Sequence, residues 1–160
     1  MGFEVVAVDV NRDAVEVMRD RGVRDARIGD IDAAGAEEYD TILLMMHGIG
    51  LVGDLEGLEA FLDRARRRLR PNGQILCDSA DLQAVIPETW EEFGGLSNPE
   101  GRYLGEVTFR LSYGEMEGTP YPWLFVDTQT LKRFAEAADF SFTVEARGGR
   151  GAYLARLICT

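Results

Sequence analysis

The sequence is poor in histidine and cysteine, and it has no long hydrophobic run. It contains one histidine and two cysteines among 160 residues. Cys77 and Cys159 lie in strand-like runs, so we expect buried thiols rather than a disulfide. A single histidine gives no metal-ligand spacing, and we expect no metal. No segment approaches ~20 apolar residues and the first residues show no secretory signal, which predicts a cytoplasmic protein without a membrane partner.

Basic side chains are also scarce. The chain has 28 acidic and 17 basic residues, and its net charge is −11. Nucleic acid phosphates require a basic face, so this balance argues against a nucleic acid partner. The main basic run, residues 64–70, falls at the end of an expected helix, where arginines favour the helix dipole. We therefore favour a solvated helix face over an anion-binding site.

The first half of the sequence alternates strand-like and helical segments, which is typical of a parallel α/β sheet. The expected strands are 4–9, 26–29, 40–46 and 74–78, and the expected helices are 12–21 and 55–69. Asn11 is the expected N-cap of the first helix, and Gly22 its stop. Residues 40–46 are the most apolar run, so we expect a central strand buried on both faces. A tight turn is expected at 71–73.

The pattern changes after Asp78. The segment 81–126 reads as an insert, with a short helix expected at 87–93 and an antiparallel hairpin formed by 106–113 and 121–126. A helix over 128–138, capped by Asp127 or Thr128, and a hairpin of strands 140–147 and 152–159 complete the chain. We find no linker, and we expect a single domain spanning 1–160.

Two carboxylates stand where open α/β sheets bind ligands, at the carboxyl ends of expected parallel strands. Asp9 ends the strand 4–9 and can accept hydrogen bonds from both hydroxyls of a ribose. The alternative is an exposed acid in the turn before the helix. Asp30 follows the strand 26–29 and can accept a hydrogen bond from an adenine amino group. Taken alone, Asp30 is better interpreted as a surface turn acid.

The chemistry of the remaining candidates is less specific. His47 follows the strand 40–46 and is a candidate general base, although we favour a hydrogen-bonded structural role. Five aromatic residues lie on or beside the inserted hairpin: Tyr103, Tyr113, Tyr121, Trp123 and Phe125. Tyr103, Tyr121 and Trp123 are the substrate candidates among them. These aromatic residues either stabilise the hairpin through cross-strand contacts or bind substrate as part of an apolar lid.

Together the segments resemble the class I S-adenosylmethionine-dependent methyltransferases. The matching segments are Val-Ala-Val-Asp at 6–9, Ile-Gly-Asp-Ile at 28–31, the apolar strand 40–46 with the loop after it, and Leu-Arg-Pro-Asn-Gly-Gln-Ile-Leu at 69–76. The resemblance implies a Rossmann-like, mostly parallel sheet ending in an antiparallel hairpin. It also implies S-adenosylmethionine as cofactor and a small-molecule acceptor.

The resemblance further implies a role for each matching residue. The implied cofactor-binding residues are Asp9, Val10, Asp30, Ile31, His47 and Gly48. The first two would hold the ribose and flank the adenine, the next two would bind the adenine edge and face, and the last two would lie near the methionine end and the acceptor. No residue is identified as the catalytic base by the resemblance.

The sequence departs from this family before its first strand. The family's glycine-rich loop, which holds the methionyl part of the cofactor, and the strand preceding it have no counterpart before residues 4–9. That strand would separate the counterparts of 4–9 and 40–46, and its absence leaves open strand edges. We expect an N-terminally truncated form of a longer ancestor. The alternatives are direct pairing of the two strands and a strand donated by a second chain, as in a homodimer.

The leading functional hypothesis is methyl transfer from S-adenosylmethionine to a small molecule, impaired by the missing loop. A second hypothesis is a cofactor-free relative that serves as a binding or assembly module. A third is a nicotinamide-dependent oxidoreductase, because Asp9 also suits the ribose of that cofactor. The antiparallel ending and the Pro-Asn-Gly turn argue against the third.

Overall fold

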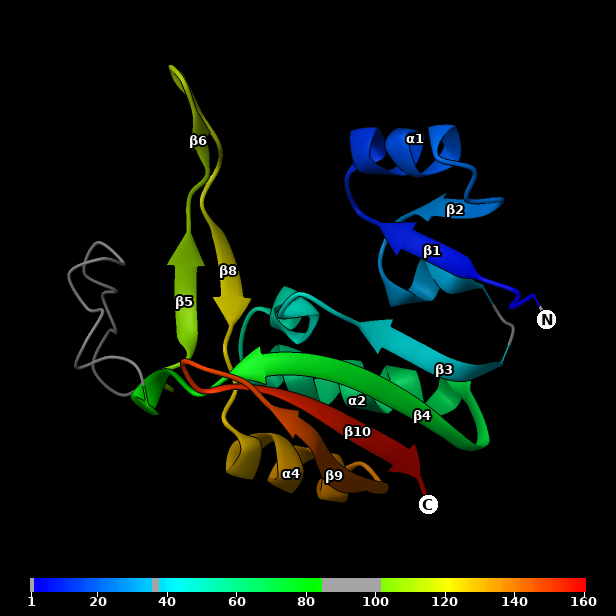
Figure 1. Cartoon of the computed structure of the whole chain (residues 1–160), viewed down its shortest axis with the longest axis vertical. Coiled ribbons are helices and arrows are strands. Elements are labelled where there is room, and N and C mark those ends of the chain that lie inside the picture. Colours follow the sequence, from blue (N-terminus) through cyan, green and yellow to red (C-terminus); the bar gives the residue numbers. More distant parts are fainter. Residues whose placement is uncertain (1, 36–37, 85–101) are drawn as a thin grey trace. The chain divides into compact units, whose positions relative to one another are not determined.

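The structure, a computed structural model, describes residues 2–35, 38–84 and 102–160 (Figure 1). The short helix expected at 87–93 lies outside the described residues. The chain separates into two compact units, Met1–Glu38 and Tyr39–Thr160. The single domain expected from the sequence stays a prediction.

The first unit is a small parallel β–α–β arrangement. β1 (Val6–Asp9) pairs in parallel with β2 (Asp25–Ile28), and α1 (Arg12–Asp20) connects them. Asn11 caps α1 through its side-chain oxygen, as predicted. Gly22 adopts a φ of +89° just after the helix, in the left-handed region that favours glycine. Because the pairing is parallel, the carboxyl ends of β1 and β2 lie at the same edge of their sheet.

The second unit is built on a four-stranded sheet with the strand order β3-β4-β10-β9 (Figure 1). Its strands are β3 (Tyr39–Leu44), β4 (Leu69–Ala80), β9 (Phe140–Arg147) and β10 (Ala152–Cys159). β3 and β4 are parallel, whereas β10 runs antiparallel to both of its neighbours. Two of the predicted parallel strands, 40–46 and 74–78, therefore belong to one sheet with the predicted closing hairpin.

Two helices, α2 (Leu55–Arg68) and α4 (Thr128–Ala137), lie side by side in this unit. The core contains apolar residues of both helices and of the sheet: Leu58, Phe61, Leu62, Ala65, Leu131, Ala135, Ile75, Cys77, Ala155 and Leu157. Burial of each leucine contributes roughly 1.5–3 kcal/mol relative to exposure. The N-cap of α4 is Asp127 and not Thr128, the other residue predicted for this position. No helix in the described parts of the chain is long and apolar enough to cross a membrane.

β4 is longer than predicted, because it contains the turn expected at 71–73. β3 pairs with β4 on both sides of residues 70–73, which lie opposite a single residue of β3. Asn72 adopts a φ of 63° within this segment. The turn residues therefore form a bulge inside a strand, since the flanking segments pair with the same neighbour.

The prediction that residues 40–46 form a central strand buried on both faces is wrong. β3 ends at Leu44, and Leu43 is 63% exposed. Within residues 38–84 and 102–160, β3 pairs only with β4, so its other edge is open. The strands 4–9 and 40–46 belong to different units, and their direct pairing stays a prediction.

The inserted hairpin is present in two paired segments. β5 (Glu106–Phe109) pairs antiparallel with β8 (Tyr121–Leu124), and β6 (Ser112–Tyr113) pairs antiparallel with β7 (Met116–Glu117). Gly114 adopts a φ of 60° in the connecting turn. The alternating pattern of the sequence thus predicted the pairing, while the interruption between the segments was not predicted.

Candidate functional site

Asp9 and Asp30 follow neighbouring parallel strands of the first unit. Asp9 is the last residue of β1 and pairs in register with Ile28, and the N–H of Gly29 donates to the Asp9 carbonyl oxygen at 2.9 Å. Asp30 comes next and caps the short 3-10 helix η1 (Ile31–Ala34). Both acids therefore lie at the carboxyl edge of one sheet, where ligands bind in open α/β folds.

Each of these acids also has a local backbone partner. Oδ1 of Asp9 accepts the N–H of Asn11 at 2.8 Å, and Oδ1 of Asp30 accepts the N–H of Asp32 at 3.0 Å. Aspartate commonly accepts a backbone N–H two residues further along in a turn, so these contacts are the structural role expected of both residues. Val10, the neighbour of Asp9, is 75% exposed. An apolar side chain exposed beside a strand-end carboxylate fits a ligand that has both an apolar ring and hydroxyl groups.

His47 follows β3 in an unusual backbone conformation. Met46 and His47 adopt φ values of 62° and 58°, in the left-handed region that non-glycine residues rarely adopt. The 3-10 helix η2 (Gly48–Val52) begins directly afterwards. Each such residue costs on the order of 1–3 kcal/mol, and the conformation persists only where surrounding contacts fix it.

Asp78 of β4 provides the contact that fixes His47. The backbone N–H of His47 donates to Oδ2 of Asp78 at 3.0 Å, and Nδ1 of the ring lies 3.8 Å from the same oxygen. Both residues follow the pair Leu44 and Cys77, which are partners in the parallel register. Nδ1 of His47 and Oδ1 of Asp78 are buried without a hydrogen-bond partner among the described residues. Since each unpaired buried polar atom costs about 1–3 kcal/mol, this pair suits a functional site better than a structural one.

A row of aromatic rings extends from His47 along the hairpin, and we call it the aromatic row: Phe109, Tyr121, Trp123 and Phe125. Phe125 meets the His47 ring edge-on, with 5.5 Å between centroids. Phe109 lies 6.0 Å from Phe125 and 6.2 Å from Tyr121, and Trp123 lies 6.2 Å from Tyr121. All four rings are half-buried. The structure thus brings Tyr121 and Trp123, two predicted substrate residues, into one contact row with His47.

The glycines after His47 let the hairpin approach the loop backbone. A Cβ added to Gly50 would come within 2.1 Å of Nε1 of Trp123, and one added to Gly53 would lie 3.2 Å from Cγ of Pro122. The N–H of Gly50 also donates to the carbonyl oxygen of His47 at 2.8 Å. Residues 47–53 therefore hold the hairpin next to the candidate site.

Tyr103, the third predicted substrate residue, has a different environment. Its hydroxyl donates to Oδ2 of Asp127 at 2.6 Å and accepts the backbone N–H of Asp127 at 2.9 Å. Burial and the bond to this carboxylate raise the pKa of Tyr103. Burial tends to raise the pKa of Asp127, but hydrogen bonds from Thr130 and Tyr103 outweigh it and hold that pKa below its usual value. Tyr103 therefore stabilises the start of α4, and its contact with substrate stays a prediction.

Two members of this group, Asp78 and Phe109, were not predicted from the sequence as site residues. Phe125 belonged to the predicted aromatic set but was not among the substrate candidates. Asp78 ends the predicted strand 74–78, so the argument that selected Asp9 and Asp30 would also have selected it. The contacts of Phe109 and Phe125 depend on how the hairpin lies against His47, which local sequence does not specify.

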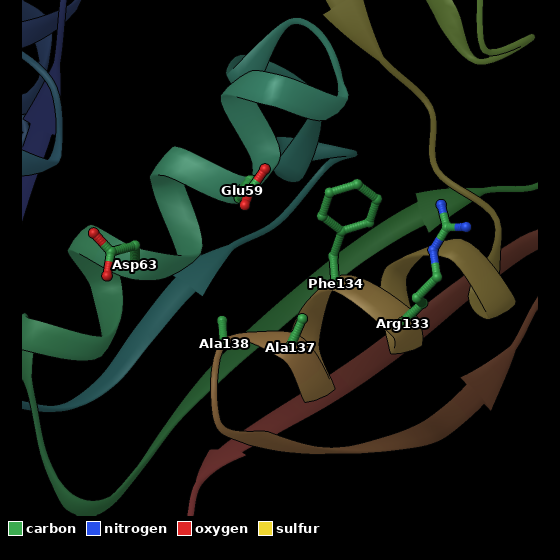
Figure 2. A pocket seen from close by; sticks show the side chains of 6 residues that line it. All are labelled: Glu59, Asp63, Arg133, Phe134, Ala137 and Ala138. Atoms are coloured by element: carbon green, nitrogen blue, oxygen red, sulfur yellow. The ribbon is translucent and has the colours of Figure 1, made fainter.

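A cavity of about 330 Å³ lies between α2 and α4 (Figure 2). Glu59 and Asp63 of α2 face Arg133 and Phe134 of α4 across it, and Ala137 and Ala138 complete its lining. The Arg133 guanidinium lies 5.3 Å from the centre of the Phe134 ring. The lining includes neither His47 nor Asp78, so this cavity is separate from the candidate site.

The arginines around the end of α2 have partners within the chain. Arg66 donates to the carbonyl oxygen of Thr160 at 3.0 Å, and Arg70 donates to both oxygens of Asp40 at 2.9 Å. These contacts agree with the interpretation of the run as a helix face. No group of three or more His, Cys, Asp or Glu side chains in the described ranges is placed to hold a metal.

No protein-family model matches the chain, and no curated protein matches it. Among solved structures, the chain is similar to an S-adenosylmethionine-dependent methyltransferase from Bacteroides fragilis, crystallised with S-adenosyl-L-homocysteine. The two are 37% identical with a TM-score of 0.80, and the match covers 98% of this chain and 64% of that one. The chain therefore spans less than two thirds of the length of this relative.

More distant structures share the arrangement. An S-adenosylmethionine-dependent methyltransferase from Clostridium acetobutylicum is 10% identical with a TM-score of 0.62, covering 96% of this chain and 74% of that one. CalS10, an amino pentose methyltransferase from Micromonospora echinaspora bound to S-adenosylmethionine, is 13% identical with a TM-score of 0.60, covering 96% and 72%. At such identities the likeness concerns the fold alone.

Proposed function

This chain has the class I S-adenosylmethionine-dependent methyltransferase fold, and we propose that it binds S-adenosylmethionine and transfers the methyl group to a small-molecule acceptor. The observation that carries the proposal is the match over 98% of the chain, at 37% identity, to a methyltransferase crystallised with S-adenosyl-L-homocysteine. The strand ends that carry Asp9, Asp30 and His47 support it, because they are the sheet positions at which open α/β folds bind ligands.

The first unit would bind the nucleoside. The proposed cofactor residues are Asp9, Val10, Asp30, Ile31, His47 and Gly48. The carboxylate of Asp9 would accept the ribose hydroxyls, and the exposed Val10 beside it would flank the adenine. Asp30 and Ile31 would contact the adenine edge and face. His47 and Gly48 would lie near the methyl group and the acceptor.

We keep the prediction that the 160-residue chain binds this cofactor weakly. Within its own unit, β1 has one strand edge without a partner, and so has β3. An open strand edge leaves backbone groups without partners and holds the adjoining loops less firmly. Ordering those loops when the cofactor binds would cost free energy and so lower the affinity.

Calorimetric titration with S-adenosylmethionine and S-adenosyl-L-homocysteine tests the proposed function. We expect saturable binding, and we expect Asp9→Ala to weaken it about 10- to 100-fold because a charged hydrogen-bond acceptor for the ribose is lost. Asp20→Ala removes an exposed acid at the end of α1 and serves as the matched control. Unchanged affinity in Asp9→Ala would contradict the ribose assignment. A wild-type chain that binds neither compound would favour the cofactor-free binding module.

A further inference from the structure

We propose that His47 and Asp78 form the proton-accepting pair for an aromatic acceptor with a hydroxyl group, so that the proposed methyl transfer is O-methylation of a phenol. The inference rests on the proposed function and deepens it by naming the acceptor class. The observations that support it are the geometry of the His47–Asp78 pair and the aromatic row next to that pair.

The orientation of the imidazole leaves one nitrogen for a substrate. Nδ1 is buried and faces Oδ2 of Asp78 at 3.8 Å, yet the His47 side chain is 41% exposed. The exposed part of the ring is therefore the part away from Asp78, which carries Nε2. A histidine held with one nitrogen toward a carboxylate and the other toward solvent has the arrangement of a general base.

Asp78 is placed to stabilise the protonated form of this base. Its side chain is 23% exposed, and Oδ2 already accepts the His47 backbone N–H, which sets the distance between the two side chains. When the imidazole gains a proton, the carboxylate lies within ion-pair distance of Nδ1. Asp78 is the charged partner that the structure records for His47, and the ring that contacts His47 from the hairpin, Phe125, is uncharged. Asp78 is thus a positioning residue.

The aromatic row favours a flat acceptor. Its four rings are half-buried, and Phe125 links them to the imidazole. Aromatic rings prefer offset or edge-on contacts with other rings at centroid distances of about 4.5–7 Å. An aromatic acceptor that packs on Phe109 and Phe125 would therefore present its substituent to His47.

The presence of a base favours a hydroxyl group over a neutral amine as the atom that accepts the methyl group. A neutral amine attacks through a free lone pair, whereas a phenol becomes strongly nucleophilic only as it loses its proton. The bound cofactor supplies an electrophilic methyl group on a sulfonium. The phenol oxygen forms the new O–CH₃ bond while the S–CH₃ bond breaks and its electron pair stays on sulfur. The hydroxyl proton passes to Nε2 of His47 and then to solvent, so charge and atoms balance.

Methyl transfer to phenol and to 4-nitrophenol, at a mildly alkaline pH where only the second is largely ionised, tests this inference. Replacing His47 by Gln should lower the rate with phenol by roughly 10²- to 10⁴-fold, the usual contribution of a general base. The loss should be clearly smaller with 4-nitrophenol, which needs no base. Affinity for S-adenosyl-L-homocysteine, measured by calorimetry, reports the proposed cofactor contact of His47 separately. Because both phenols share that contact, the difference in rate loss between them reports the base alone.

Asp78→Asn supplies the second readout. Because the carboxylate positions the imidazole that accepts the proton, its removal should lower the rate with phenol and lower the rate with 4-nitrophenol clearly less. A purely structural role would lower both rates alike. Glu115→Gln, at the exposed turn of the hairpin, is the control and should match the wild type.

The outcomes separate the two proposals. A wild-type chain that binds S-adenosyl-L-homocysteine but methylates neither phenol overturns this inference alone. An equal loss with both phenols in His47→Gln also overturns it, because a base would matter only for the unionised acceptor. A wild-type chain that binds neither S-adenosylmethionine nor S-adenosyl-L-homocysteine overturns the proposed function, and this inference with it.

Discussion

At the scale of single residues, the contact between Tyr103 and Asp127 joins a segment before β5 to the cap of α4. The phenol hydroxyl both donates to the carboxylate and accepts the N–H of Asp127. The lowered pKa of Asp127 means that the ionised carboxylate is favoured in the folded state. Its contribution to stability is therefore present above the unfolded pKa, about 3.9, and is lost as the pH falls through the lower folded value.

We predict that Tyr103→Phe destabilises the chain by about 1–3 kcal/mol at neutral pH, because the Asp127 N–H loses its acceptor and the carboxylate loses a donor. The difference from the wild type should shrink as the pH falls below the pKa of Asp127. Urea unfolding across this pH range measures both effects. Tyr113→Phe is the matched control, since Tyr113 is 82% exposed and should change stability little. Equal effects of the two variants would contradict the role given to Tyr103.

Residue-level prediction from sequence succeeded where the signal was local. Asn11 caps α1, and Asp127 caps α4, as their short polar side chains before helical segments indicated. His47 was assigned mainly a structural role, because a lone histidine at a strand end is as readily a hydrogen-bonded structural group as a base. Its partner Asp78 is 31 positions away in the sequence. No pattern within the loop 47–53 points to Asp78.

At the scale of elements, the contact between η2 and the hairpin organises the candidate site. The indole of Trp123 occupies the space where a side chain at Gly50 would stand. Because Gly50 has no side chain, Trp123 can pack against its backbone, although the two residues are more than 70 positions apart in the sequence. The hairpin itself was predictable from its alternating residues, but its docking on η2 was not.

We predict that Gly50→Ala destabilises the chain by about 1–3 kcal/mol, the usual cost of forcing an added methyl group into a packed site. The indole must move, so the tryptophan fluorescence should change as well. Gly149→Ala is the control, because a Cβ there meets nothing within 4 Å. Thermal unfolding followed by fluorescence distinguishes the two. A Gly50→Ala protein with the wild-type midpoint and spectrum would show that the contact is unimportant.

At the scale of the whole molecule, each of the two units has one strand edge without a partner inside that unit, that of β1 in the first and that of β3 in the second. The strand 40–46 was expected in the middle of a sheet because it is strongly apolar, yet Leu43 on β3 is exposed. An open apolar strand edge is a template for pairing with another strand. The homodimer, one of the alternatives left open by the sequence, stays a prediction that this edge supports.

Light scattering of the purified chain tests that prediction. If a second copy pairs along β3, the measured mass should be that of two chains, and Leu43→Lys should shift it toward one, because lysine on an edge disfavours pairing. Arg110→Lys, an exposed hairpin position, keeps the net charge and serves as the control. A monomer at all concentrations would exclude pairing between copies.

The sequence by itself determined the order of strands and helices, the caps of α1 and α4, both hairpins and the strand-end positions of Asp9 and Asp30. These features follow from short-range patterns: hydrophobic period, capping residues and turn residues. Only the tertiary structure decided that His47 meets Asp78, that Phe125 meets His47, and that Tyr103 meets Asp127. Such contacts depend on which strands become neighbours and how far each extends. That choice is made by packing of the whole chain, so no local segment encodes it.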